Sequence, residues 1–289
     1  MKICLSCSHE FSSSGWICPA CGKSPAVLDG FPAFAPELAR GGGGFFPDAH
    51  EKLDKMQHKS FWFRARNRLI KTLAGKYCAK AEAVLEIGCG TGYVLNALAA
   101  AMPGARLCGS ELDLAGLALA AKRLQDRAEL FQMDARRVPF REEFDLVVAC
   151  DLLEHIEDDL QALREIRKAL KSGGMALLTV PQHPFLWSSM DERACHKRRY
   201  RMRELAEKAG EAGFVIVADT SFVTTLFPFM FFQRFMCRGG KQADAAKILE
   251  LPHSIDRLFE LCLLLEVWLI GKGMSFPFGG SRVVLARRD

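Results

Sequence analysis

The sequence predicts an α/β fold with a small cysteine-bearing module at its N-terminus, and three observations indicate this. An apolar run at 84–87 leads directly into Gly88, Gly90 and Gly92, and a helical pattern opens after them. Short apolar runs and helical runs then alternate along the chain, as in a parallel sheet whose strands are joined by helices. Two Cys-x-x-Cys pairs stand at the start of the chain.

The composition is that of a folded globular protein. The chain has 289 residues, of which 49% are apolar and 25% charged, so it can form one large core and a small module. The net charge of +5 is a mild excess that does not identify a nucleic-acid binder. We expect neither a signal peptide nor a spanning helix. A cytoplasmic, reducing location follows, in which the eleven cysteines would form no disulfides.

Four cysteines have the spacing of a zinc site. Cys4, Cys7, Cys18 and Cys21 form two Cys-x-x-Cys pairs, and two such hairpin tips can bring four thiolates to one tetrahedral zinc. Four thiolates leave the metal no open position, so we expect structural zinc that supplies the folding energy of a zinc ribbon. Redox pairs or incidental cysteines are the alternative.

The domain boundaries follow from these features and from glycine-rich stretches. We expect a zinc ribbon at 1–28, a linker at 29–47 with a tetraglycine hinge, and the main domain at 48–289 with an apolar helical insertion at about 221–280. The expected strands are 84–87, 105–110, 129–132, 146–149, 175–180, 214–218 and 282–286. The expected helices between them are 92–102, 114–124, 157–171 and 201–212.

The glycine run predicts a nucleotide-binding crevice. A strand, a glycine turn and a helix place the turn at the carboxyl end of a parallel strand, where glycines let a ligand approach the backbone. Glu111 and Asp134 each follow one of the next two strands, so both carboxylates can reach the same crevice. Glu111 can accept hydrogen bonds from both hydroxyls of a ribose. A tight turn without a ligand is the alternative.

The run from Glu86 to Gly92 resembles the first motif of class I S-adenosylmethionine-dependent methyltransferases of the type 11 kind, and the resemblance extends from about Ser60 to the C-terminus. It implies S-adenosylmethionine as cofactor and a Rossmann-like sheet of seven strands in the order 3-2-1-4-5-7-6, with the last strand antiparallel. The segment Asp151 to His155 resembles the part of the family that closes over the cofactor. The implied cofactor-binding residues are Glu86, Gly88, Cys89, Gly90, Gly92, Glu111, Leu112, Asp134, Ala135, Cys150, Asp151, His155 and Arg66.

The stretch 60–70 has two interpretations. Aromatic residues beside Arg64, Arg66 and Arg68 indicate an amphipathic helix that packs on the sheet with solvated arginines. Alternatively, related methyltransferases place such a helix over the cofactor pocket, where Arg66 would bind the methionine carboxylate.

The segment 183–203 follows the fifth predicted strand, at the edge of the active site. Five cations lie between Lys197 and Arg203 without an intervening carboxylate, so we expect an uncompensated cluster that binds an anionic acceptor. A solvated basic loop is the alternative. The candidate acceptor-binding residues are Trp187, Arg198, Arg199 and Tyr200, and the candidate general bases are His155 and His196.

The insertion is strongly apolar at 222–236 and 258–270, which predicts two helices that fold onto the acceptor mouth and contact a lipid or a membrane surface. Core packing or dimerisation is the alternative.

The resulting hypothesis is a methyltransferase that acts on an oxygen or nitrogen atom of a small, lipid-linked or anionic acceptor. The alternatives are an RNA methyltransferase that uses the ribbon and basic loop, or a non-catalytic cofactor-binding or scaffold protein. The oligomeric state stays open.

Overall fold

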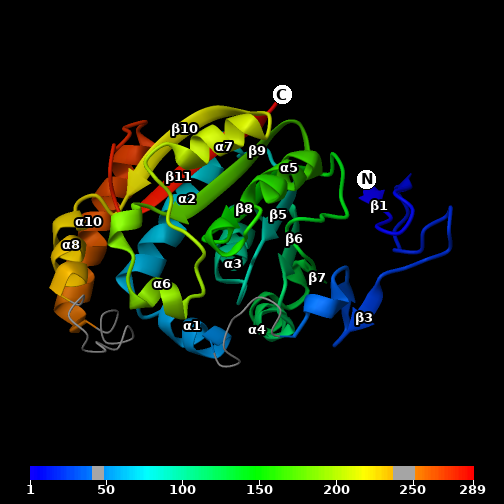
Figure 1. Ribbon diagram of the computed structural model, residues 1–289, viewed down its shortest axis with the longest axis horizontal. Helices are drawn as coiled ribbons and strands as arrows, with labels where there is room; N and C mark the ends of the chain where they lie inside the picture. Colours follow the sequence, from blue (N-terminus) through cyan, green and yellow to red (C-terminus); the bar gives the residue numbers. More distant parts are fainter. Residues whose placement is uncertain (41–48, 237–250) are drawn as a thin grey trace.

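The computed structural model describes residues 1–40, 49–236 and 251–289, without the side chains of 49 and 233–236. The predicted tetraglycine hinge lies outside this part of the chain. Within it, the central sheet has nine strands in the order β10-β11-β9-β8-β5-β6-β7-β4-β3 (Figure 1). Their bounds are β3 Ala26–Leu28, β4 Phe31–Ala33, β5 Ala83–Ile87, β6 Arg106–Glu111, β7 Glu129–Gln132, β8 Phe144–Cys150, β9 Leu170–Pro181, β10 Phe214–Phe222 and β11 Ser281–Arg288.

Strands β5 to β11 have the order 3-2-1-4-5-7-6 that the resemblance implied. The last strand, β11, lies between β9 and β10 and is antiparallel to both. The sheet differs from the prediction at its other edge, where β4 and β3 continue it beyond β7. There Ala33 pairs with Gln132, whose buried side-chain amide also bonds both backbone groups of Ala35. The first residues of the expected linker are therefore part of the sheet.

Helices cover both faces of the sheet. Buried residues of α2, α3, α4 and α10 pack on one face, and those of α5 and α7 pack on the other. The helices are α1 Ala49–Gln57, α2 Phe61–Tyr77, α3 Tyr93–Ala101, α4 Leu114–Leu124, α5 Asp159–Ala169, α6 Ser189–Arg193, α7 Glu204–Glu211, α8 Phe227–Met236 and α10 His253–Gly271. Short 3-10 turns are η1 Pro36–Leu38, η2 Gln125–Arg127, η3 Leu153–His155 and η4 Pro184–Leu186.

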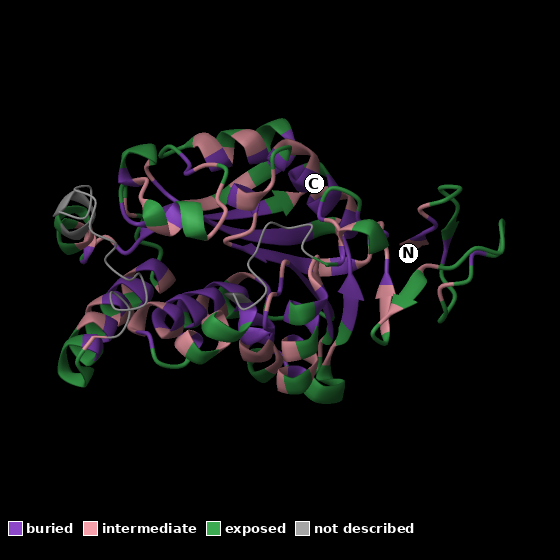
Figure 2. Cartoon of the chain, turned by 60° about the horizontal axis from the view of Figure 1, so that its bottom comes forward, coloured by how far each residue is buried: buried purple, intermediate pink, exposed green. Residues whose placement is uncertain are grey.

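The central strands are mostly apolar because both of their faces are buried. Successive side chains of a strand point to opposite faces. Accordingly, Val84 and Leu146 contribute to the core under α2 and α3, whereas Leu85 and Val147 contribute to the core under α5. Figure 2 shows the buried residues concentrated along this sheet. Such runs are typical of parallel sheets covered on both sides.

The N-terminal module docks on the edge of the sheet. Its hairpin consists of β1 Lys2–Ile3 and β2 Glu10–Phe11, and the Ile3 N–H donates to the Pro139 carbonyl at 2.9 Å. Trp16 packs edge-on against the rings of Phe34, Phe131 and Phe140, with centroid distances of 4.6 to 5.6 Å. Burial of an aromatic side chain of this size supplies much of the energy of such a contact.

The insertion forms α8 and α10, so the predicted pair of helices is present. Helix α10 packs on α2. There Arg64 forms ion pairs with Asp256 at 2.5 Å and Glu260 at 2.9 Å. The prediction of solvated arginines therefore does not hold for Arg64. Among the described residues, none of the helices combines the length and the apolar character that crossing a membrane requires.

Candidate active site

A cavity of about 980 Å³ lies at the carboxyl ends of the central strands. Its wall includes residues from β5, β6 and β8, from the segment after β7, and from α1, α2 and α8. Of the predicted site residues, those lining it are Arg66, Glu86, Gly88, Cys89, Glu111, Leu112, Asp134, Ala135, Cys150, Asp151, His155, His196 and Arg199. Those absent from the wall are Gly90, Gly92, Trp187, Arg198 and Tyr200.

The glycine loop needs glycine for two reasons. Gly88 and Gly92 both have a φ of +72°, a backbone conformation that residues other than glycine rarely adopt. A Cβ atom at Gly88 would also come within 2.7 Å of Leu152, and one at Gly92 within 3.1 Å of Ala120. The loop can therefore pack closely between the segment after β8 and helix α4.

Glu111 fixes the shape of this loop. One carboxylate oxygen accepts the Gly90 N–H at 2.9 Å, and the other accepts the Leu112 N–H at 2.7 Å. Asp134 is held in turn by Arg136, whose Nη2 lies 2.7 Å from its carboxylate. Both predicted acids thus stand in the cavity wall at neighbouring strand ends.

Two buried ionisable residues stand beside the glycine loop. The side chain of Glu86 is almost fully buried, and its Oε2 has no hydrogen-bond partner among the described residues. Burial raises the pKa of Glu86 to about 8, although the nearby Arg66 guanidinium opposes this shift. Arg66 comes from α2, pairs with Asp151 and lies 4.6 Å over the Trp62 ring. Its Nε also has no hydrogen-bond partner within the described part.

The cavity wall also holds two histidines and a buried acid. Glu154 and His155 lie in η3, directly after β8, and His196 follows α6. The ring centroids of the two histidines are 4.8 Å apart. Burial and the neighbouring His196 lower the pKa of His155 to about 4. Burial and the Asp151 charge raise the pKa of Glu154 well above its ordinary value.

The expectation of an uncompensated cation cluster is wrong for Arg198 and Arg199. Arg198 lies 3.1 Å from Asp159, and the buried Arg199 lies 2.7 Å from the carboxylate of Asp191. Tyr200 is fully buried and donates its hydroxyl to Asp159 at 2.5 Å. The carboxylates that neutralise these cations, Asp159 and Asp191, both precede the basic run in the sequence. The run alone therefore did not reveal them.

Several residues of the wall were missed by the sequence prediction. Leu53 and Met56 of α1 and Phe229 and Met230 of α8 supply apolar surface. Asp191 also lines the cavity, and a signal for its position existed. It stands three residues after Ser188, and the two form a capping box at the start of α6.

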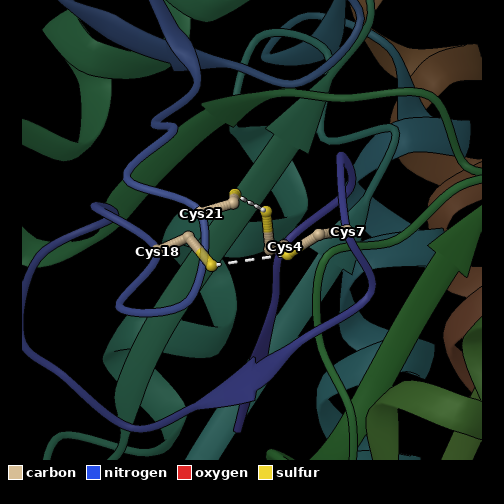
Figure 3. Close-up of side chains that lie close together, drawn as sticks. All are labelled: Cys4, Cys7, Cys18 and Cys21. Carbon is tan, nitrogen blue, oxygen red and sulfur yellow. Dashed lines mark hydrogen bonds between the residues drawn. The ribbon is translucent and has the colours of Figure 1, made fainter.

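The four N-terminal cysteines lie together, as the spacing predicted (Figure 3). The Sγ atoms of Cys4 and Cys21 are 3.7 Å apart, and those of Cys7 and Cys18 are 3.6 Å apart. Four sulfurs bound tetrahedrally at about 2.3 Å from zinc would lie roughly 3.8 Å from one another. The cluster therefore fits one zinc ion.

The comparisons agree with this geometry. The family model described as a methyltransferase domain matches residues 85–178, from β5 into β9. These residues therefore resemble a methyltransferase domain. A "Probable S-adenosylmethionine-dependent methyltransferase" of Mycobacterium tuberculosis is 27% identical over 55% of this chain and 58% of its own length. A ubiquinone biosynthesis O-methyltransferase of Pseudomonas aeruginosa is 32% identical over 35% of this chain and 45% of its own length.

A solved structure shows the same fold. The [4+2]-cyclase SpnF has a TM-score of 0.54 and 21% identity, covering 78% of this chain and 83% of its own. The predicted fold class and the resemblance to S-adenosylmethionine-dependent methyltransferases are thus confirmed. The chain spans less than two thirds of the length of the curated relatives it matches.

The residues of the cavity wall fit S-adenosylmethionine. Its methionine part carries an ammonium and a carboxylate, and its ribose carries two hydroxyls. The buried Glu86 and Arg66, each with an atom that lacks a hydrogen-bond partner among the described residues, offer complementary groups, and the ammonium of the cofactor would favour the ionised form of Glu86. Glu111 at the end of β6 offers the acceptor that a ribose requires.

Proposed function

We propose that the protein transfers the methyl group of S-adenosylmethionine to an oxygen or nitrogen atom of a small acceptor with an apolar part. The unpartnered Glu86 and Arg66 atoms beside the glycine loop carry the cofactor assignment. Relatives named as O-methyltransferases make oxygen the first choice of acceptor atom.

The chain's own residues would bind and orient both reactants. Glu86, Arg66 and Glu111 would hold the two ends of the cofactor, which would leave its methyl group near the centre of the cavity. The acceptor would enter past α8, whose Phe229 and Met230 suit an apolar group. Its reacting atom would lie near His155 and His196, which stay the candidate bases. Positioning and approach geometry would account for most of the acceleration.

Calorimetry with S-adenosylmethionine tests the cofactor assignment. We expect binding in the micromolar range, about −8 kcal/mol. Glu111→Ala should weaken it at least tenfold, because both the loop and the ribose lose their acceptor. Glu207→Ala, on the exposed surface of α7, is the matched control. Binding of NAD in place of S-adenosylmethionine would refute the proposal. Mass spectrometry of cell extracts incubated with the labelled cofactor would then identify the acceptor.

The alternatives receive less support. The paired Arg198 and Arg199 are not available as a basic surface, so no observation favours an RNA acceptor. A non-catalytic role is separated from methyl transfer by the turnover assay, since the fold alone does not establish chemistry.

We also propose that α10 keeps the acceptor mouth near a lipid surface. Its exposed apolar stripe consists of Ile255, Leu258, Leu261, Leu265 and Trp268.

A further inference from the structure

Three side chains in the cavity wall form a cluster with the composition of a metal site. Glu154 and His155 belong to η3, and His196 reaches the same point from the segment after α6. One possible ligand atom from each lies within 4.8 Å of the others, and all three residues line the cavity. The cluster is separate from the four cysteines of the ribbon.

Glu154 is the first indication that a cation belongs there. Its side chain is completely buried, yet neither carboxylate oxygen has a hydrogen-bond partner among the described residues. Nε2 of His196 lies 3.9 Å from Oε1 of Glu154, which is beyond hydrogen-bond distance. Burying an acid without a partner is costly, and a bound metal ion would remove that cost.

His196 is oriented as a metal ligand would be. Its Nδ1 lies 3.0 Å from Oδ1 of Asp191. That carboxylate is buried and also accepts a hydrogen bond from Nε of Arg199 at 2.7 Å, so it is held in place. If Nδ1–H donates to Asp191, Nε2 carries the lone pair and faces Glu154. A carboxylate that orients a histidine in this way is the usual outer partner of a metal-bound imidazole.

We propose that Glu154, His155 and His196 bind a divalent transition-metal ion such as zinc. Two imidazoles and one carboxylate suit zinc and its neighbours in the first row, whereas magnesium and calcium prefer oxygen ligands throughout. Metal–ligand distances of about 2.0–2.2 Å require small side-chain rotations from the present separations. Three protein ligands leave positions open for water or for an acceptor oxygen, which is the pattern of a catalytic site rather than a structural one.

The role of this ion rests on the proposed function, although its binding does not. An acceptor hydroxyl bound to the ion would lose its proton to water more easily. The oxygen would then form a bond to the methyl carbon while the sulfur–methyl bond breaks and its electron pair stays on sulfur. The products are the methyl ether, S-adenosylhomocysteine and one proton. In this arrangement His155 and His196 would hold the ion, and this role replaces that of candidate base.

Metal content of the full chain tests the proposal. Protein equilibrated with zinc and freed of excess should hold two ions per chain, one in the ribbon and one in the cavity. Glu154→Gln and His196→Gln should each hold one, because each removes a ligand but changes little volume. Glu157→Gln is the matched control, since Glu157 lines the same cavity from an exposed position and should leave two.

Cobalt distinguishes the two sites without reference to activity. Cobalt in the ribbon should give strong thiolate charge-transfer absorption, whereas the second ion should add only weak bands typical of nitrogen and oxygen ligands. Circular dichroism and cofactor binding establish that each variant is folded. One ion per chain in the wild type, or two in a folded Glu154→Gln variant, would overturn the metal site. Absence of S-adenosylmethionine binding with two ions present would instead refute only the proposed function.

Discussion

Glu86 couples the unfolding free energy to pH. Its pKa is about 8 in the folded chain, against an ordinary value of 4.5. Between these values the folded chain holds a proton that the unfolded chain has released, so stability falls as pH rises. The effect is at most about 1.4 kcal/mol per pH unit for one group. Urea unfolding of cofactor-free protein at pH 5.5, 6.5 and 7.5 should show a smaller decline in Glu86→Gln than in the wild type. Equal slopes would mean that Glu86 titrates normally.

Arg199 is important for stability because its partner Asp191 is buried with it. Removing one member of a buried ion pair leaves an uncompensated charge and costs about 3–5 kcal/mol. We therefore expect Arg199→Ala to lower the unfolding free energy by roughly that amount. Arg201→Ala, two residues away on the surface, should change it by less than about 0.5 kcal/mol. Denaturant titration of both variants checks this, and similar values for the two would contradict it.

At the scale of an element, the exposed stripe of α10 provides a test of lipid contact. Leu261 and Leu265 are each about half exposed, at 51% and 54%, and lie one turn apart. Glutamates at both positions should abolish flotation with liposomes, because charged side chains resist entry into the interface. Val215→Glu/Val217→Glu on β10 is the control, since these valines are exposed elsewhere. Flotation that survives the α10 changes would exclude this helix as the contact.

At the scale of the whole molecule, the ribbon should be separable from the main domain. Cys4→Ser/Cys18→Ser should lower the zinc content by one ion per chain and lower the Tm by a few degrees, because Trp16 would lose its docked position. The main domain should keep its circular dichroism and its cofactor binding. Cys262→Ser, far from the cluster in sequence, is the control. Full zinc content in the double variant would refute the ribbon assignment.

The sequence predicted those features that depend on local patterns. The glycine loop, the cysteine pairs and the apolar strands are each determined by a few consecutive residues, and all are present in the structure. Features that depend on distant partners were less accessible. The pairing of Ala33 with Gln132 and the neutralisation of Arg198 by Asp159 each join residues far apart in the chain. The spacing of apolar and polar residues within one element does not predict contacts of this kind.

The candidate site shows the same division. The acids at the strand ends could be placed because parallel strands end at one edge of the sheet. Tyr200 was predicted to face the acceptor, but its ring is buried in the core. A tyrosine beside arginines gives no indication of such burial. The sequence could not predict that the Glu154 carboxylate lacks a hydrogen-bond partner among the described residues, because this depends on the residues that surround it in the fold.

The docked ribbon has a consequence for synthesis of the chain. Lys2 pairs with Phe140, so the ribbon leaves the ribosome well before the edge that receives it. At about 5–20 residues per second, the delay is on the order of ten seconds. During this time Trp16 lacks the rings of Phe131 and Phe140 on which it packs. If the four cysteines bind zinc as proposed, the supply of zinc during translation would determine whether a folded ribbon is ready when residues 139–141 emerge.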